Sequence, residues 1–153
     1  MRTGARIGVD VGEVRVGVAR SDTAGVLALP VRTLRRAPDG AELAVLGRIV
    51  EEYGAIEVVV GLPLNLSGEE GEAAARARRY AGQIARRTGI PVRLVDERLT
   101  TVSAHQALRD SGRPGRRHRS VVDQVAATMI LEQALAMERS TGEPAGELLE
   151  ERR

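Results

Sequence analysis

The order of apolar segments along the chain predicts an α/β fold with a mixed five-stranded sheet and helices on both faces. Three strand-like stretches separated by short turns come first, which is typical of an antiparallel meander. Helical periodicity and continuous apolar runs then alternate, as expected for βα units with parallel strands. The length of 153 residues suits one domain, which we place at residues 1–139, followed by a polar and flexible tail at 140–153.

The predicted meander begins at the first apolar run. Residues 6–11 (RIGVDV) are apolar and β-branched and end at Gly12, and residues 15–19 (RVGVA) alternate after a short turn. This pair indicates a β-hairpin. Residues 27–33 give the third strand after a turn near Gly25.

The remaining predicted elements alternate between helix and strand. Residues 41–53 place apolar side chains at helical spacing and stop at Gly54, whereas residues 56–61 (IEVVVG) form a continuous apolar run typical of a buried parallel strand. We further expect helices at 72–88, 102–110 and 121–139, a strand at 92–95, and loops at 62–71 and 111–119. Ser120 is the expected N-cap of the last helix. The first strand would pair with the fourth.

The composition excludes several kinds of chemistry. The chain has no cysteine, so disulfides, thiolate metal sites and a cysteine nucleophile are ruled out. No run approaches the roughly 20 apolar residues of a membrane span, and no signal peptide is recognised, so we expect a cytoplasmic protein without a membrane partner. All basic residues are arginine and the pI is about 9.9, which weakly favours a polyanionic partner.

Four acidic residues stand out by their context. Asp10 interrupts an apolar strand, Asp96 and Glu97 end another, and Asp123 lies in the expected first turn of an otherwise apolar helix. Each also has a structural interpretation. Asp10 could be a strand-end residue, the Asp96-Glu97 pair could form a local salt bridge with Arg98, and Asp123 could be a favourable charge at a helix start. Because parallel strands bring their carboxyl ends to one edge, the acids could converge there.

Converging carboxylates repel one another unless a hard cation lies between them. Mg²⁺ prefers oxygen ligands, and a pair of such ions can activate water and stabilise the leaving oxygen of a phosphodiester. The acids therefore indicate a Mg²⁺- or Mn²⁺-dependent nuclease that uses Asp10, Asp96 and/or Glu97, and Asp123.

Four motifs in order resemble a known family. They are DVGEVRVGVARSD at 10–22, GLPLNLSG at 61–68, DERLTT at 96–101 and DQVAATMIL at 123–131. Over residues 5–137 the chain resembles the YqgF/RuvX family, whose members are assigned to Holliday junction resolution and to 5′-end processing of pre-16S rRNA.

The resemblance implies an RNase H-like fold, as in the RuvC resolvases, with divalent metals held by carboxylates. Carried over motif by motif, these are Asp10, the pair Asp96 and Glu97, and Asp123. Adjacent strand residues point to opposite faces, so one member of the pair is expected to bind metal, and we favour Glu97 beside Asp10 and Asp123.

Polar and basic residues near the motifs are the predicted substrate-binding groups. They are Arg15, Asn65, Ser67, Arg98, Arg113, Arg116, Arg117 and Arg119. The basic loop could be only a solvated loop, Arg98 could pair with an acid, and the Asn-Ser-Gly segment could be an ordinary turn. With two tyrosines as its only aromatic residues, the chain should contact structured RNA or branched DNA through phosphates rather than stacked bases.

Two other functions compete with the nuclease. A non-catalytic RNA-binding or ribosome-assembly factor would keep the fold without cleavage. A nucleotide-binding ATPase module also begins with D-x-G and a hairpin, but it needs two such halves and this chain holds one. Resolution of two symmetric strands would require a homodimer, and no segment identifies its interface.

Overall fold

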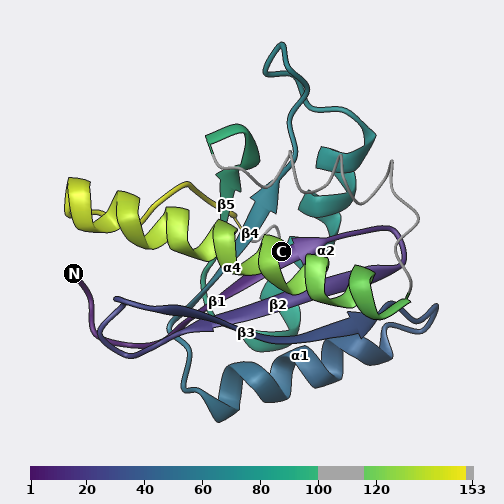
Figure 1. Cartoon of the computed structure of the whole chain (residues 1–153), viewed down its shortest axis with the longest axis horizontal. Helices are drawn as coiled ribbons and strands as arrows, with labels where there is room; N and C mark the ends of the chain where they lie inside the picture. Colours follow the sequence, from purple (N-terminus) through teal and green to yellow (C-terminus); the bar gives the residue numbers. More distant parts are fainter. Residues whose placement is uncertain (100–115, 151–153) are drawn as a thin grey trace.

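A mixed six-stranded sheet forms the centre of the computed structural model, which describes residues 1–99 and 116–150 (Figure 1). The strands lie in the order β3-β2-β1-β4-β5-β6. β1, β2 and β3 form an antiparallel meander, β4 and β5 run parallel to β1, and β6 is antiparallel to β5. The strands are β1 (Arg6–Val11), β2 (Arg15–Ser21), β3 (Ala28–Arg35), β4 (Glu57–Leu62), β5 (Val92–Asp96) and β6 (Glu147–Leu148).

Helices cover both faces of the sheet, as the sequence predicts. α1 (Ala41–Glu52) and α2 (Glu72–Thr88) lie on one face, and α4 (Arg116–Thr141) crosses the other over β1, β2 and β3 (Figure 1). A 3₁₀ turn, η1 (Glu97–Leu99), follows β5 directly. The α/β class and the pairing of β1 with β4 are both confirmed.

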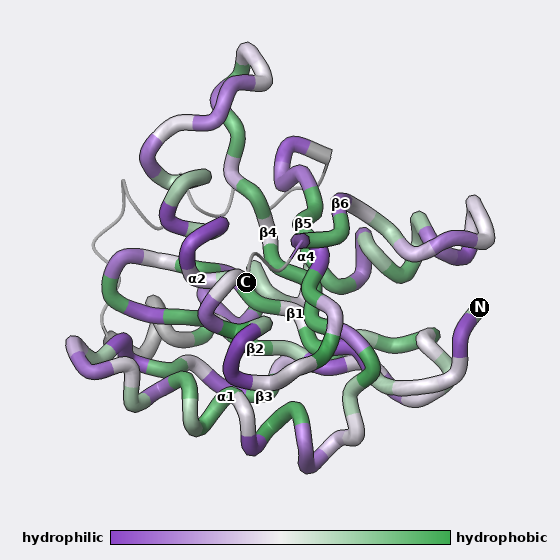
Figure 2. Tube along the Cα trace, turned by 180° about the vertical axis from the view of Figure 1, so that it is seen from behind, coloured by the Kyte–Doolittle hydropathy of each residue, from purple (hydrophilic) through white to green (hydrophobic). Residues whose placement is uncertain are grey.

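Alternation along the strands divides the core into two layers. Val58 and Val60 of β4 pack with α1 and α2, whereas Val59 between them packs with Ala126 and Ile130 of α4. The central strands are therefore apolar on both faces, and Figure 2 shows them as predominantly hydrophobic while α1 alternates along its length.

Glycines let α4 approach the sheet closely. A Cβ atom at Gly8 of β1 would lie 2.8 Å from the Ala127 carbonyl oxygen, and one at Gly17 of β2 would overlap the backbone of Asp123. Such contacts leave no room for a side chain between helix and strand. The position of Asp123 over the sheet therefore depends on Gly17.

The chain after α4 adds a sixth strand to the sheet, so the prediction of five strands was wrong in number. Leu148 and Glu147 pair with β5, the Leu149 N–H donates to the Val92 carbonyl at 2.9 Å, and Arg78 of α2 holds Glu147. Part of the tail predicted to be flexible is thus fastened to the domain. Two residues are too few to show strand periodicity, which is why the sequence did not reveal them.

The last helix begins earlier than predicted. α4 starts at Arg116, so Ser120 lies inside the helix and is not its N-cap, and Asp123 is not in the first turn. Four residues assigned to the basic loop, 116–119, belong to this helix. The predicted helix at 102–110 and the loop residues 111–115 lie outside the described residues.

Candidate active site

Asp10 projects toward α4 from the centre of the sheet. It lies two residues after Gly8, which faces α4, so its side chain leaves β1 on the same side. Its partner across the β1–β2 ladder is Gly17, the glycine that lies beneath Asp123. The sheet and helix thus bring Asp10 and Asp123 to the same layer.

Glu97 reaches the same layer from the end of β5, which lies on the opposite side of β1 from β2. It follows β5 two residues after Val95, which packs on the α4 side. A Cβ atom at Gly61 of β4 would lie 2.5 Å from Glu97 Oε1 and 2.5 Å from Ile130 Cδ1 of α4. The Glu97 side chain therefore lies across β4, between the sheet and the helix.

The three acids are all nearly inaccessible to solvent. Relative exposure is 2% for Asp10, 3% for Glu97 and 3% for Asp123. Burying an ionised carboxylate is costly without compensating partners, and all three make contacts in the structure. Within residues 1–99 and 116–150, no three His, Cys, Asp or Glu side chains are arranged closely enough to hold a metal ion as they stand.

Arg15 contacts this layer through Asp123. Its Nε donates to Asp123 Oδ2 at 2.8 Å, and its side chain is 26% exposed. A guanidinium that donates to a buried carboxylate offsets part of the cost of removing that carboxylate from water. Arg15 thus connects the β1–β2 hairpin to α4 and presents a partly accessible positive charge beside Asp123.

Asp96 is engaged differently from Glu97. The Arg98 guanidinium lies 2.8 Å from Asp96 Oδ2, and the Arg98 N–H also donates to Oδ1. The side-chain hydrogen bond from Arg98 holds the pKa of Asp96 below its usual range. Val95 packs on the α4 side, and because neighbouring strand residues point to opposite faces, Asp96 lies away from the α4 layer. Asp96 thus forms the local salt bridge with Arg98 that was the alternative to a metal-binding role.

The loop after β4 forms an ordered hairpin. Leu64 and Glu70 form an antiparallel bridge, and the Asn65 N–H donates to the Glu69 carbonyl at 2.8 Å. The Gly68 N–H closes the turn onto the Asn65 carbonyl, also at 2.8 Å. The backbone N–H groups of Asn65 and Gly68 are therefore used inside the turn.

The predicted basic residues before Asp123 are only partly located. Arg113 lies outside the described residues, and Arg116, Arg117 and Arg119 are placed only by the backbone of the first turns of α4. Their helical backbone runs directly toward Asp123. Their predicted role in phosphate binding stays a prediction.

Sequence reasoning missed the residues that support the acids. Gly17 and Gly61 make the space beneath Asp123 and Glu97, and isolated glycines within strands were the available signal. Arg36 was also missed: it donates to the Gly12 carbonyl at 3.0 Å and stacks over the Tyr80 ring at 4.8 Å. Nothing in the sequence pattern separates Arg36 from other surface arginines.

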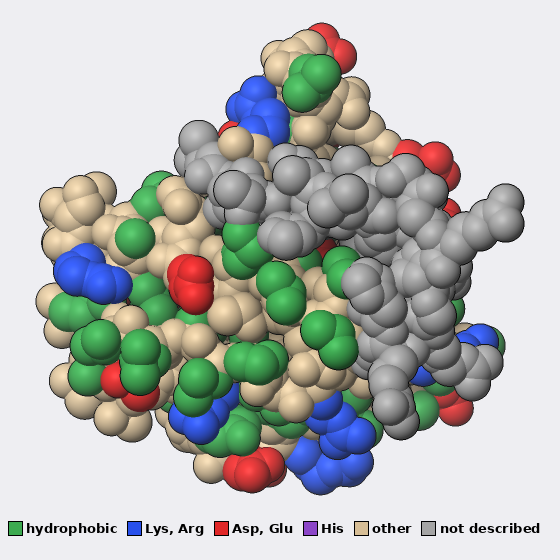
Figure 3. Space-filling model, in the orientation of Figure 1, with side chains coloured by type: hydrophobic (Ala, Val, Ile, Leu, Met, Phe, Trp, Pro, Cys, Tyr) green, Lys and Arg blue, Asp and Glu red, His purple; other side chains and the backbone are tan. Residues whose placement is uncertain are grey.

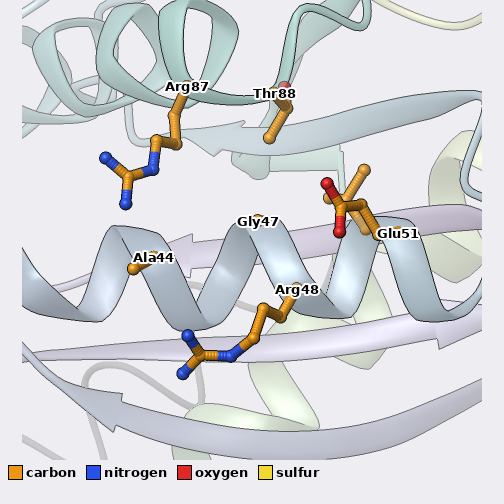
Figure 4. A pocket seen from close by; sticks show the side chains of 7 residues that line it. Ala44, Gly47, Arg48, Glu51, Arg87 and Thr88 are labelled. Atoms are coloured by element: carbon orange, nitrogen blue, oxygen red, sulfur yellow. The ribbon is translucent and has the colours of Figure 1, made fainter.

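A groove between α1 and α2 is separate from the acids. It has a volume of about 260 Å³ and lies on the opposite face of the sheet from α4. Arg48 and Glu51 of α1 and Arg87 of α2 border it (Figure 4). The face shown in Figure 3, over which α4 runs, instead carries scattered hydrophobic side chains. Val121 and Val125 of α4 are both exposed.

The architecture is that of the RNase H-like proteins. Thermus thermophilus RuvC in complex with a Holliday junction substrate superposes with a TM-score of 0.57 at 15% identity, covering 93% of this chain and 99% of that one. A second Thermus thermophilus RuvC structure gives a TM-score of 0.54, with 92% and 99% covered. At these identities the likeness concerns the fold.

The sequence relationship is closer. The family model described as "RuvX: Holliday junction resolvase" matches residues 4–137, and the chain belongs to this family. A protein of Nocardioides sp. named "Putative pre-16S rRNA nuclease" is 57% identical, with 99% of both chains covered. A Thermobifida fusca protein of the same name is 53% identical, with 98% of both covered. Among the described helices, none is both long and apolar enough to cross a membrane.

Proposed function

We propose that the chain is a metal-dependent endonuclease that hydrolyses phosphodiester bonds of structured nucleic acid. The observation that supports the proposal is the burial of Asp10, Glu97 and Asp123 in the layer between the sheet and α4, where Asp10 pairs with the Gly17 that lies beneath Asp123 and Glu97 lies over Gly61. Buried acids brought from two strand ends and a helix to one layer are costly for stability. A function that uses their charge accounts for that cost.

The donor set suits a hard divalent cation. Asp10, Glu97 and Asp123 offer only carboxylate oxygens, which match Mg²⁺ or Mn²⁺. When bound, the metal would supply Lewis-acid activation of a phosphodiester and a more acidic bound water. Arg15 competes for Asp123 in the structure, so loading the site requires this ion pair to loosen or the side chains to rotate.

The precursor of 16S rRNA is the substrate that we favour. Relatives at 50% identity or more over nearly their whole length carry the pre-16S rRNA nuclease name. The family description and the RuvC likeness support a Holliday junction as the second candidate. Arg15 and the arginines at 113–119 would bind phosphates of either nucleic acid.

Cleavage assays with matched acid variants test this function. The intact chain and the variants Asp10→Asn and Glu97→Gln are incubated with Mg²⁺ or Mn²⁺ and either precursor rRNA or a four-way DNA junction. Glu52→Gln is the control because Glu52 is exposed at the end of α1. We expect both site variants to lose at least about 100-fold in rate, since the metal contributes several kcal/mol to the transition state. Equal rates in all chains would refute the assignment.

A non-catalytic RNA-binding role is the alternative. It is favoured by the Arg15–Asp123 ion pair and by the absence of a ready metal cluster among the described side chains. It predicts binding of precursor rRNA without cleavage at any metal concentration. The same assays therefore separate the two functions.

A further inference from the structure

The hairpin after β4 carries an unusual side chain at its tip. Leu66 is 99% exposed, whereas the next most exposed large hydrophobic residue among those described, Val26, is 63% exposed. Leu66 occupies the turn closed by Asn65 and Gly68. An isolated exposed leucine is common, but a fully solvated one on an ordered tip costs solvation and contributes no packing.

The hairpin is held firmly enough to present this side chain in one direction. The Leu64–Glu70 bridge and the two backbone hydrogen bonds of the turn order its arms. Arg78 Nε of α2 donates a hydrogen bond to Glu70 Oε1 at 2.6 Å, and the Arg98 guanidinium lies beside Gly68. The tip is therefore preorganised before any partner binds.

The hairpin also lies beside the acids. It continues directly from β4, whose Gly61 lies beneath Glu97, and it rises beyond the carboxyl edge of the sheet (Figure 1). Leu66 is five positions after Gly61, so the two Cα atoms are at most about 18 Å apart. That reach corresponds to about five base steps at roughly 3.4 Å each.

The charges on the hairpin disfavour a phosphate contact at its tip. Glu69 is exposed, Glu70 is already paired with Arg78, and Arg98 is paired with Asp96. In Figure 3, the part of the molecule that protrudes at the top carries a hydrophobic patch with charged side chains near it. An apolar tip with acidic neighbours suits the stacked faces of bases better than the nucleic-acid backbone.

We propose that Leu66 is an apolar wedge that enters the base stack of the bound nucleic acid within about five base steps of the cleaved phosphodiester. This inference rests on the proposed nuclease function. Aliphatic side chains open base steps in this way in proteins that kink duplexes, and the chain offers no aromatic residue near the site for the purpose.

The test uses 2-aminopurine, whose fluorescence rises when it is unstacked. The label is placed in turn at each position within five base steps of the cut, in a four-way DNA junction and in the stem of precursor rRNA. Binding is followed by fluorescence anisotropy in the Asp10→Asn background, so the nucleic acid stays intact. We expect a several-fold rise at one or two adjacent positions.

Substitutions assign that rise to one side chain. Leu66→Ser should abolish it while changing the affinity by less than about tenfold, and Leu66→Met should retain it. Leu27→Ser is the matched control, because Leu27 is 59% exposed just before β3, away from the hairpin. Unchanged melting temperatures would show that all three variants fold.

The contrary outcomes are distinct. An equal rise in Leu66→Ser, or no rise at any position, overturns the wedge and leaves the nuclease function standing if the intact chain cleaves. Absence of both binding and cleavage by the intact chain overturns both proposals.

Discussion

Glu97 lies directly over Gly61, so that a Cβ atom at Gly61 would lie 2.5 Å from Glu97 Oε1. The same atom would lie 2.5 Å from Ile130 Cδ1 of α4. The empty space above a glycine in β4 is thus filled by the carboxylate from η1 and by the helix. This relationship joins the placement of an acid to the packing of the core.

Gly61→Ala should therefore weaken both stability and cleavage. The added methyl group forces Glu97 and Ile130 apart, and overpacking of this kind costs about 1–3 kcal/mol of unfolding free energy. Gly82→Ala in α2 is the control: its Cβ would lie 3.5 Å from the flexible Arg86 side chain. Removing a helical glycine should stabilise by about 0.5–1 kcal/mol. Denaturant unfolding measures the free energy of unfolding of the two variants. Equal stability of Gly61→Ala and Gly82→Ala would contradict the packing argument.

Asp96 and Glu97 should differ sharply on substitution. Asp96→Asn breaks an exposed ion pair with Arg98 and should change the cleavage rate by less than about tenfold. Glu97→Gln removes a buried carboxylate from the α4 layer and should cost about 100-fold or more. Single-turnover cleavage rates decide this, and a larger loss in Asp96→Asn would reverse the assignment.

Much of the fold could be predicted from the sequence because its elements have clear periods. The β1–β2 hairpin and the buried β4 carry strong strand patterns, and α2 was predicted with its observed bounds. The short β6 was missed because its pairing depends on the edge of β5, which is a tertiary effect. The start of α4 was misplaced because Gly115 and the arginine run indicated a loop, and propensity does not fix helix ends.

The site could be predicted in part. Strand ends and a helix drew attention to Asp10, Glu97 and Asp123. The structure places Asp96 in an ion pair with Arg98 and Glu97 over Gly61, but Glu97 lies in η1 and not on the strand for which the two-residue alternation was argued. The sequence could not show that Gly17 lies beneath Asp123, or that Arg15 reaches it, because both contacts join segments about 100 residues apart. It also could not show that the turn at 65–68 uses its own N–H groups.

Acid should weaken the far end of α4. Glu138 is buried and accepts hydrogen bonds from Arg2 and from Arg6, the latter at 2.8 Å. Burial alone would raise the pKa of Glu138, but the hydrogen bonds from Arg2 and the charge of Arg6 together lower it from 4.5 to about 2. Because the folded-state pKa lies below the unfolded value, the stabilisation is fully present above about pH 4.5 and is lost as pH falls toward 2.

This loss should be visible in the unfolding free energy. Between pH 5 and pH 2 the Glu138 contribution falls by about 3 kcal/mol. Glu138→Gln should lack that part of the pH dependence and should be less stable at pH 7 by about 3–5 kcal/mol, since Arg6 remains buried without its charged partner. Denaturant unfolding at a series of pH values tests this. An unchanged pH slope in the variant would contradict it.

Nucleic-acid binding should depend steeply on salt. If about four arginines contact phosphates, affinity should fall by about 100-fold between 50 and 200 mM monovalent salt. The double variant Arg116→Gln/Arg117→Gln should reduce the slope of log affinity against log salt by about 2. The matched double variant Arg48→Gln/Arg87→Gln alters the groove on the opposite face and should leave the slope unchanged. Anisotropy titrations measure both slopes, and a flat salt response would contradict phosphate recognition.

Metal binding by the intact chain tests the carboxylate site most directly. Calorimetric titration with Mn²⁺ needs no substrate, so it reports on the acids alone. We predict that Asp10→Asn, Glu97→Gln and Asp123→Asn each weaken Mn²⁺ binding by at least about tenfold, as loss of a ligand should. Asp96→Asn should bind as the intact chain does. Equal Mn²⁺ affinity in all five proteins, or no binding by the intact chain at millimolar Mn²⁺, would contradict the account.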